Sequence, residues 1–286
     1  MRIMVTGAAG MLGTDVCSVL EAGHQVLARD VGDFDVGDHD RTVKAIAADR
    51  PEAIVHLAAF TDVEACEDRR DEAFRVNALG SMNVSAGARE VGAYLIYLST
   101  DYVFDGRKQE PYLETDEPRP LNFYGQTKLQ GERYVREVAG RNLILRTSWL
   151  FGPNGRNFVD TIIAKASSGE RLRVVNDQRG CPTYTMDLAR GISALIAKSL
   201  EGIIHVTNRG EATWFDLAES ALALAAIKTP LDAVSSNEYP AKAKRPRYSV
   251  LGSLFAGASG IEPLPPWTDG LKDHLRRRGY LGRKDD

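Results

Sequence analysis

Short apolar runs alternate with longer amphipathic stretches along the first 150 residues. The apolar runs are typical of buried strands and occupy residues 2–6, 24–30, 53–60, 94–100 and 142–151. The stretches between them carry apolar residues at helical spacing and predict helices at residues 11–22, 41–51 and 72–92, with a further helix beginning near Tyr124. Strand–helix alternation with helix-length crossovers predicts an α/β protein with a doubly wound parallel sheet of the Rossmann type.

The alternation becomes less regular after about residue 150. The remaining segments include two short apolar runs and two stretches with helical spacing, at residues 171–177, 202–208, 186–198 and 215–226. We therefore expect a first domain at residues 1–150 and a smaller lobe at residues 151–286. We expect this C-terminal lobe to be interleaved with the first domain, so that some of its segments return to the sheet.

The composition is that of an ordinary globular protein, and it limits the partners. The 286 residues are 43% apolar and 26% charged, which is enough apolar material for a real core. A net charge of −3 gives no general attraction to nucleic acid or to an acidic membrane surface. The longest apolar run, residues 221–227, is far too short to span a membrane.

Cysteine and histidine usage indicates a cytoplasmic protein. Cys17, Cys66 and Cys181 are odd in number and far apart, so we expect reduced thiols that pack in the structure. The five histidines are scattered and form no ligand pair of the HxxxH type. Because a strand is predicted to start at residue 2, we expect no signal peptide.

A glycine-rich turn follows the first strand and opens the first helix. The stretch "VTGAAGMLG" spaces Gly7, Gly10 and Gly13 as GxxGxxG. In this context Gly7 permits a tight turn, Gly10 lets a pyrophosphate approach the backbone, and Gly13 allows close helix–strand packing. The backbone N–H groups of Met11 and Leu12 at the helix N-terminus would hold the phosphates. The turn therefore predicts a dinucleotide site in the first domain.

Asp30 ends the second strand, where an acceptor for the adenosine ribose belongs in such a site. The alternative is a turn residue before Gly32, and we favour the ribose role. The neighbouring Arg29 complicates the choice of cofactor, because a guanidinium can pair with a 2′-phosphate. NADPH and NADH therefore both remain possible.

A hydroxyl, a phenol and an ammonium are expected to meet beside this site. Thr100 lies at the C-terminal edge of the fourth strand, where open α/β sheets bind ligands. Tyr124 and Lys128 follow at i,i+4 spacing, which is also common for plain packing on one helix face. In the catalytic interpretation Lys128 lowers the pKa of Tyr124, and Thr100 donates to a substrate oxygen that gains negative charge. The glycine turn and the strand order make the catalytic interpretation the favoured one.

Several motifs together resemble the extended short-chain dehydrogenase/reductase family, and within it the dTDP-4-dehydrorhamnose reductases. They are "STDYVFDG", "YGQTKLQGE", "LRTSWLFGPNGRNFV", "NDQRGCPTYTMDLA", "RPRYSVL" and "LPPW", and the resemblance covers nearly the whole chain. It implies reduction of the 4-keto group of dTDP-6-deoxy-L-lyxo-4-hexulose to dTDP-L-rhamnose with NADPH or NADH. It also implies a small nucleotide-sugar partner and a monomer or homodimer.

The resemblance assigns roles to individual residues. Thr100, Tyr124 and Lys128 match the catalytic set, with Tyr124 as the proton donor. The matched cofactor contacts are Gly10, Met11, Leu12, Asp30, Asp35, Val36, Ala59, Phe60, Thr61 and Leu98. Asp101 and Trp149 match substrate-contacting positions.

Other substrate-side residues keep two interpretations. Trp149 fits a strand-end core position as well as stacking on a sugar. Arg245 suits the neutralisation of a diphosphate, or it is an exposed loop charge. Asn157 is favoured as a helix cap.

Acidic residues match a metal site of some relatives in part. Asp15 and Asp187 occupy two positions at which some relatives hold Mg²⁺ at a dimer interface. Both side chains are shorter than the glutamates of that site, and the sequence offers no convincing third ligand. We therefore expect no metal.

Two other functions share this fold. A sugar-nucleotide dehydratase carries Asp-Glu after the strand-four threonine, whereas this chain has Asp101–Tyr102, which argues against dehydration and less strongly against epimerisation. A non-catalytic subunit, similar to the regulatory β subunit of methionine adenosyltransferase, is the other alternative. The glycines and the Thr–Tyr–Lys set are all present, so the reductase is favoured.

Overall fold

The computed structural model describes residues 1–239, 241–258, 260 and 262–281. A six-stranded sheet forms its centre and consists of β1 (Arg2–Thr6), β2 (Gln25–Arg29), β3 (Ala53–His56), β4 (Tyr94–Thr100), β5 (Asn142–Thr147) and β10 (Gly202–His205). The spatial order is β10-β5-β4-β3-β1-β2, and every neighbouring pair is parallel. The order reverses between β1 and β3, where doubly wound sheets bind ligands.

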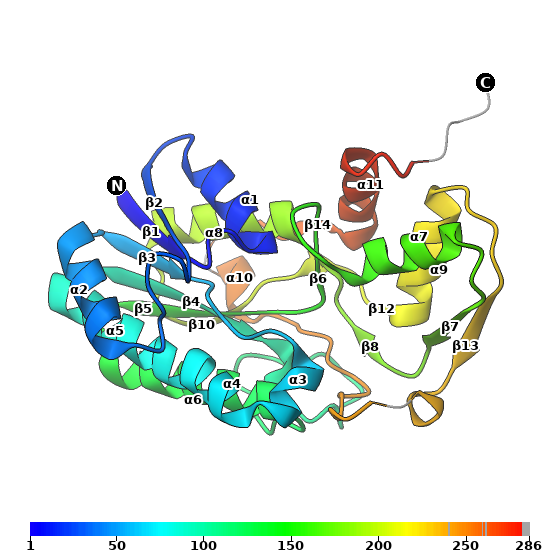
Figure 1. Ribbon diagram of the computed structural model, residues 1–286, viewed down its shortest axis with the longest axis horizontal. Helices are drawn as coiled ribbons and strands as arrows, with labels where there is room; N and C mark the ends of the chain where they lie inside the picture. Colours follow the sequence, from blue (N-terminus) through cyan, green and yellow to red (C-terminus); the bar gives the residue numbers. More distant parts are fainter. Residues whose placement is uncertain (240, 259, 261, 282–286) are drawn as a thin grey trace.

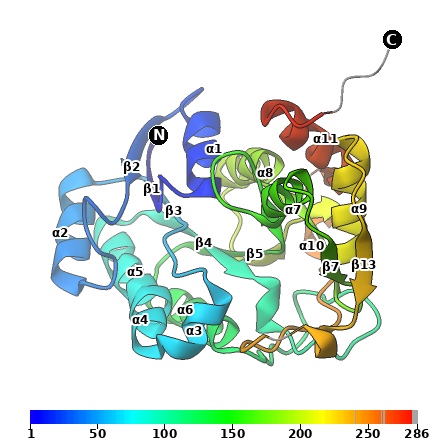
Figure 2. The same cartoon turned by 45° about the vertical axis from the view of Figure 1, so that its right-hand side comes forward.

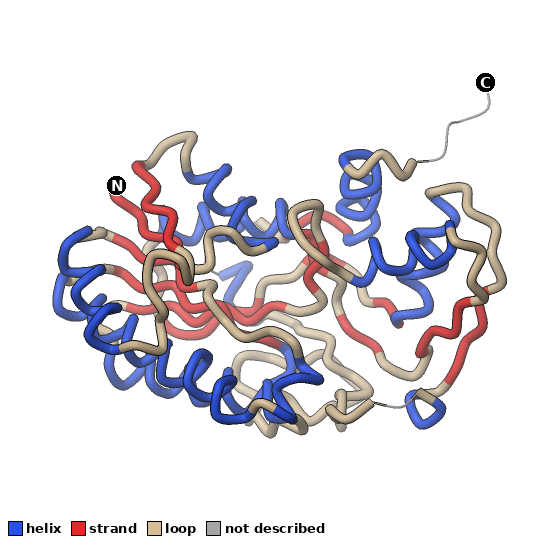
Figure 3. The backbone as a smooth tube through the Cα atoms, viewed as in Figure 1, coloured by secondary structure: helices blue, strands red, loops and turns tan. Residues whose placement is uncertain are grey.

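Helices cover both faces of this sheet (Figures 1 and 3). On one face, α1 (Met11–Leu20) and α8 (Thr185–Lys198) pack Leu12, Val16, Leu188 and Ile192 against the strands. On the other, Ile46, Val84 and Val135 fill the core from α2 (His39–Asp49), α5 (Gly80–Val91) and α6 (Phe123–Val138). The predicted doubly wound α/β fold is therefore confirmed.

Two predicted strands end earlier than the apolar pattern indicates. The run at 53–60 leaves the sheet after His56, because its neighbour β1 ends at Thr6 before the glycine turn. The run at 142–151 breaks at Trp149, whose φ of +48° lies in the left-handed region. Its last residues form a separate strand, β6 (Leu150–Phe151), which pairs with β9 (Thr183–Tyr184). After both breaks, the chain runs along the C-terminal edge of the sheet, where residues 57–61 and 148–150 line the same cleft.

The single helix predicted at 72–92 contains an irregular segment. It begins as α4 (Arg70–Phe74), passes through the π-helical turn η1 (Arg75–Leu79) and continues as α5. The short helix α3 (Val63–Asp68) precedes it, and Gly92 ends it with a φ of +72°. Segments of π-helix occur often at functional sites, and the side chain of Arg75 faces the cleft described below.

A smaller lobe stands beside the sheet (Figure 2). Its core lies between α7 (Phe158–Ser167), α9 (Trp214–Leu224) and α11 (Trp267–Arg277), with the strand pair β7 (Leu172–Val175) and β13 (Leu231–Val234) alongside. Strand β10 and helix α8 come from beyond residue 150 but belong to the sheet layer. The boundary near residue 150 stays a prediction.

Short elements complete the part of the chain that the structure describes. They are η2 (Asp101–Val103), β8 (Arg179–Gly180), β11 (Asn208–Arg209), β12 (Ala212–Thr213), η3 (Ser236–Glu238), α10 (Phe255–Ala258) and β14 (Leu264–Pro266). Among the described residues, no helix has the length and apolar character needed to cross a membrane.

Candidate active site

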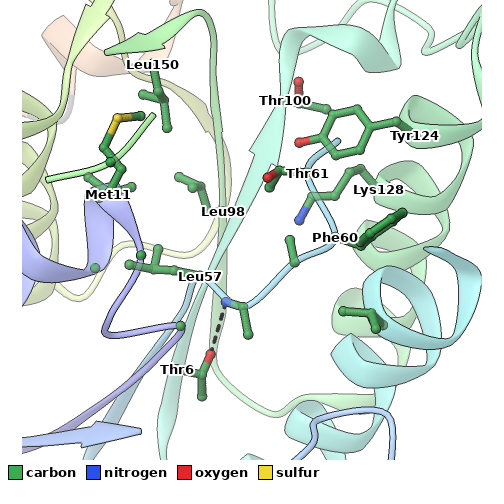
Figure 4. Close-up of a pocket in the computed structure, with 18 of the residues that line it drawn as sticks. Thr6, Met11, Leu57, Phe60, Thr61, Leu98, Thr100, Tyr124, Lys128 and Leu150 are labelled. Atoms are coloured by element: carbon green, nitrogen blue, oxygen red, sulfur yellow. Dashed lines mark hydrogen bonds between the residues drawn. The ribbon is translucent and has the colours of Figure 1, made fainter. Parts of the chain in front are cut away.

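A cleft of about 910 Å³ lies at the C-terminal edge of the sheet. It is lined by nearly all the residues that the sequence singled out, which are Gly7, Gly10, Met11, Leu12, Gly13, Asp30, Asp35, Val36, Ala59, Phe60, Thr61, Leu98, Thr100, Asp101, Tyr124, Lys128 and Trp149. Figure 4 shows Thr100, Tyr124 and Lys128 together on one side of it, with Met11 and Leu150 opposite. Of the residues predicted to catalyse or to bind cofactor or substrate, Arg245 does not line the cleft.

The glycine turn is built as the spacing predicts. Gly7 has a φ of +69°, and a Cβ there would lie 2.8 Å from the backbone nitrogen of Ala58. A Cβ at Gly13 would overlap the carbonyl oxygen of Gly7. Gly10 differs, because its φ of −72° suits any residue and a Cβ would meet only the Gly7 carbonyl oxygen, at 3.1 Å. The fold thus requires Gly7 and Gly13, whereas Gly10 keeps the cleft floor open.

The N-terminus of α1 faces the cleft without a capping side chain. Gly10 is its N-cap residue, and the first turn carries no acidic residue. The free N–H groups and the positive end of the helix dipole make this turn suitable for a phosphate. The residues present therefore fit the pyrophosphate of a dinucleotide.

Asp30 and Arg29 lie at the end of the cleft that the sequence assigns to the adenosine, and both side chains already have partners. The Asp30 carboxylate accepts from the backbone N–H of Ala9 and of Val31, each at 2.8 Å. Arg29 forms a two-pronged ion pair with Asp49, at 2.8 and 2.9 Å. The carboxylate retains lone pairs for a ribose hydroxyl, whereas the guanidinium would have to share or leave Asp49 to meet a 2′-phosphate.

A second ion pair flanks the same end of the cleft. Arg75 donates to Asp35 at 2.6 Å, and both side chains line the cleft beside Val36. Arg75 was not predicted as a site residue, because it falls inside a stretch with helical spacing. Its position in the π-helical turn turns the guanidinium toward the cleft, and nothing in the local sequence signalled that turn.

The capped start of α6 positions Tyr124 and Lys128. The Asn122 side chain accepts from the backbone N–H of Gly125 at 2.8 Å, so the helix begins one residue before Tyr124. Lys128 follows one turn later and is only 4% exposed. Thr100 ends β4 beside them, and its hydroxyl donates to Asp101 at 3.1 Å. The predicted convergence of the three side chains is what the fold produces.

The protonation of this set differs from the sequence prediction. Burial raises the pKa of Tyr124 above its usual value, with a hydrogen bond from Thr100 acting in the opposite direction. Burial lowers the pKa of Lys128 to about 7, opposed by Glu132 one turn further along α6. The expectation of a lowered pKa at Tyr124 is therefore wrong for this structure, since desolvation and the nearby Asp101 both raise it and outweigh the hydrogen bond from Thr100.

Asp101 lies buried beside Thr100, with 2% of its surface exposed. Burial raises its pKa to about 7, although hydrogen bonds from Ser249 and Thr100 favour the charged form. Its Oδ2 atom has no hydrogen-bond partner in the described part of the chain. The cleft wall therefore contains a buried carboxyl group whose pKa is raised to about 7.

Trp149 belongs to an aromatic wall on the side of the smaller lobe. Its indole stacks on that of Trp214 with ring centroids 3.6 Å apart and planes 5° apart. Gly180 packs against the same indole, because a Cβ there would lie 2.5 Å from Trp149 Cε2. The Trp214 indole donates to Gln178 at 3.2 Å. Nothing near Trp214 in the sequence indicates that it reaches the cleft, since it lies 65 positions from Trp149.

Arg245 lies behind the cleft wall. Its guanidinium pairs with Glu64 at 2.7 Å, and Tyr102 is among the groups that raise its pKa. In this arrangement the charge is already compensated, and its predicted contact with a diphosphate stays untested.

Asn157, Asp15, Asp187 and Cys181 have structural partners. Asn157 caps α7 through the backbone N–H of Asp160, as favoured from the sequence. Asp15 accepts from Thr185 and Asn154, while Asp187 accepts from Asn208 and Arg190. Cys181 is buried, and all three cysteines are free thiols. No cluster of three or more potential metal ligands occurs among the described residues.

Comparisons with known proteins match the chain along nearly its whole length. A family model described as RmlD substrate binding domain matches residues 1–279. A dTDP-4-dehydrorhamnose reductase of Streptomyces griseus is 40% identical over 280 residues, which are 95% of this chain and 92% of the relative. The spore coat polysaccharide biosynthesis protein SpsK of Bacillus subtilis (strain 168) is 36% identical to this chain. The alignment covers 97% of this chain and 98% of SpsK.

Solved structures give the same result. The crystal structure of a dTDP-4-dehydrorhamnose reductase from Bacillus anthracis, in complex with NADP, superimposes with a TM-score of 0.94 at 38% identity. The alignment covers 96% of this chain and 99% of that one. A UDP-glucose 4-epimerase of Thermus thermophilus, with a TM-score of 0.84 at 24% identity, shows the shared fold alone. The chain belongs to the family of the RmlD substrate binding domain, and with it to the dTDP-4-dehydrorhamnose reductase group that its motifs resemble.

Proposed function

We propose that this protein reduces the 4-keto group of a dTDP-6-deoxy-4-hexulose to dTDP-L-rhamnose, with NADPH or NADH as the reductant. The observation that carries the proposal is the meeting of Thr100, Tyr124 and Lys128 in one cleft with an uncapped helix N-terminus. Family membership supports the same reaction. Free thiols and the use of a nicotinamide cofactor support action in the cytoplasm. The resemblance to the reductases supports a monomer or homodimer.

The cofactor would lie along the strand ends. Gly10, Met11 and Leu12 would hold the pyrophosphate through backbone N–H groups, and Asp30 would accept from the adenosine ribose. Asp35 and Val36 would flank the adenine, while Ala59, Phe60, Thr61 and Leu98 would lie under the dinucleotide. When bound, the reduced nicotinamide supplies the hydride.

The side chains of the set supply the proton and hold the reacting oxygen. Thr100 donates a hydrogen bond to the substrate oxygen, which becomes alkoxide-like as it gains charge. Tyr124 then transfers its phenolic proton to that oxygen. A raised pKa suits this task, because the phenol keeps its proton at neutral pH until an alkoxide stronger than itself takes it. The charged form of Lys128 stabilises the phenolate left behind and contacts the nicotinamide ribose.

The substrate would enter from the side of the smaller lobe. Asp101 and Trp149 would contact the sugar, and Arg245 would be drawn from Glu64 toward the diphosphate. Relatives with different sugar substrates in their names, such as the dTDP-4-keto-6-deoxy-D-glucose reductase of Streptomyces niveus, are 38% identical to this chain. The thymidine diphosphate and the 4-keto group are therefore the best-supported parts of the proposed substrate.

A coupled assay tests the proposal. The purified protein is mixed with NADPH, dTDP-4-keto-6-deoxyglucose and a 3,5-epimerase, and the loss of reduced nicotinamide absorbance is followed. Turnover that requires the epimerase supports the rhamnose product, whereas turnover without it indicates reduction of the unepimerised sugar. Tight NADPH binding with no turnover on either sugar would favour the non-catalytic subunit instead.

A further inference from the structure

The ammonium of Lys128 lies over an aromatic ring. Its Nζ atom is 4.2 Å from the ring centroid of Tyr97, which comes from β4 and is fully buried. Within the residues that the structure describes, this Nζ makes no hydrogen bond and no ion pair. The face of the Tyr97 ring is therefore the main contact of a buried cationic group at the cleft.

The same tyrosine also contacts the backbone of Lys128. Its hydroxyl donates to the Lys128 carbonyl oxygen at 3.2 Å. The phenol fits beneath α6 because position 131 is glycine, where a Cβ would overlap the Tyr97 hydroxyl and lie 2.8 Å from the Asn77 carbonyl oxygen. Tyr97 thus contacts both the main chain and the charged end of Lys128.

The charged and titratable groups around the Lys128 ammonium do not offer it an alternative partner to the Tyr97 ring. Glu132, the carboxylate nearest along α6, is committed to a buried ion pair with Arg146 at 2.7 Å and to Ser99 at 2.5 Å. His56, from β3, is buried and neutral, because burial and Lys128 lower its pKa to about 3. Tyr124 faces the cleft from the preceding turn and is neutral as well. No uncommitted anion is therefore available to Lys128 among these groups.

We propose that Tyr97 is a positioning residue for Lys128. The face of the Tyr97 ring keeps the Lys128 ammonium charged and directed into the cleft. The hydroxyl of Tyr97 has a separate task, which is to hold the α6 backbone. This inference rests on the proposed function, because it assumes that the charged form of Lys128 contacts the bound cofactor.

Two substitutions separate the tasks of the ring and the hydroxyl. Tyr97→Phe keeps the π-face and loses the hydrogen bond, whereas Tyr97→Met removes the ring at moderate loss of volume. NADPH affinity is measured by fluorescence titration across pH, and it should fall as pH rises and Lys128 loses its proton. Tyr97→Met should move the midpoint of this fall to lower pH by about 0.5–1.5 units, because a cation–π contact stabilises only the charged form. Tyr97→Phe should leave the midpoint unchanged.

The controls account for stability and for the ligand. Tyr94→Met removes a ring from the same strand on the opposite face of the sheet, so it should lower stability without moving the midpoint. The 2′-phosphate of NADPH titrates in the same pH window, but equally with every variant. If Tyr97→Met does not fold, pentafluorophenylalanine at position 97 keeps the ring and reverses the charge of its face, and it should move the midpoint in the same direction.

The outcomes distinguish this inference from the proposed function. An unchanged midpoint in Tyr97→Met, or in the fluorinated protein, would overturn the role of the ring. Lys128→Met tests the assumption beneath it, because that variant should lose the part of the pH-dependent fall that Lys128 causes and keep only the part that the 2′-phosphate causes. If the fall is as large in Lys128→Met as in the wild type, the proposed contact between Lys128 and the cofactor is wrong.

Discussion

Tyr124 offers the sharpest test at the scale of single residues. Tyr124→Phe keeps the ring and its packing, so the free energy of unfolding should change by no more than about 1 kcal/mol. Loss of the proton donor should lower kcat by at least about 10²-fold, while NADPH affinity persists. Steady-state kinetics with thermal melts measure both. A fully active variant would end the proposed mechanism.

Gly10 tests the phosphate site. Gly10→Val places a branched side chain over the turn, although the backbone itself accepts a Cβ with one close contact. NADPH affinity should therefore fall by more than about tenfold while the protein remains folded. Fluorescence titration and circular dichroism report the two properties separately. Normal NADPH binding would show that this turn does not hold the pyrophosphate.

The raised pKa of the buried Asp101 carboxyl predicts that the free energy of unfolding depends on pH. Its folded-state pKa of about 7 lies above the ordinary value of 3.8, so the folded state loses stability as pH rises between those values. Asp101→Asn should remove this loss and gain stability relative to the wild type across that range, by at most about 4 kcal/mol, with a plateau above pH 7. Thermal melts across pH measure the difference.

Asp105→Asn is the matched control for Asp101. The pKa of Asp105 is lowered, because hydrogen bonds from Tyr112 and the Arg107 backbone outweigh its burial. This variant should therefore lose relative stability as pH rises, which is the opposite sign. The same sign in both variants would show that the buried Asp101 carboxyl is not the cause.

Residue-level chemistry was readable from the sequence where it depended on local spacing. Gly7, Gly10 and Gly13, or Tyr124 and Lys128, lie within a few positions of each other, so turn and helix geometry alone places them. The pKa of Tyr124 was predicted in the wrong direction, because desolvation depends on the whole surrounding core. Trp214 and Tyr97 also escaped prediction, since only tertiary packing brings them to Trp149 and Lys128.

At the scale of elements, the first turn of α6 links stability to chemistry. Asn122→Ala removes the cap and should lower the free energy of unfolding by about 0.5–2 kcal/mol. Because Tyr124 lies in the turn that would fray, kcat should fall too, by up to ~10²-fold for a displacement of about 1 Å. Asp38→Ala removes the cap of α2, which does not line the cleft, and is the control. Equal kcat values in the two variants would contradict the link.

Element boundaries show where periodicity stops being informative. The apolar pattern continues through residues 57–60 and 148–151, although neither stretch extends its strand. Hydrophobicity there reflects burial against the cleft and the second lobe, as for Leu57 and Leu150, which pack beside the core of the sheet. The helix of 72–92 was predicted in extent but not in its π-helical turn, since spacing of 3.6 residues cannot reveal one extra residue.

At the scale of the whole molecule, residues from both parts of the chain form the core of the sheet layer. Leu188, Ile192 and Ile204 come from beyond residue 150, yet they pack in the cluster that contains Val5 and Val16. Strand β10 also pairs with β5 and covers that edge of the sheet. The first 150 residues alone therefore lack part of the core of the sheet, and without β10 the edge of β5 would be exposed and would invite aggregation.

The expected consequence is that a fragment of residues 1–150 does not fold alone, although the dinucleotide motif lies entirely within it. Without α8, the face of the sheet beside α1 would be exposed, and burial of several large side chains, each worth about 1.5–3 kcal/mol, would be lost. The fragment should show a broad thermal transition, bind a hydrophobic dye and fail to bind NADPH, whereas the full chain melts cooperatively. A sharp melt and near-native NADPH affinity of the fragment would instead establish residues 1–150 as an independent domain.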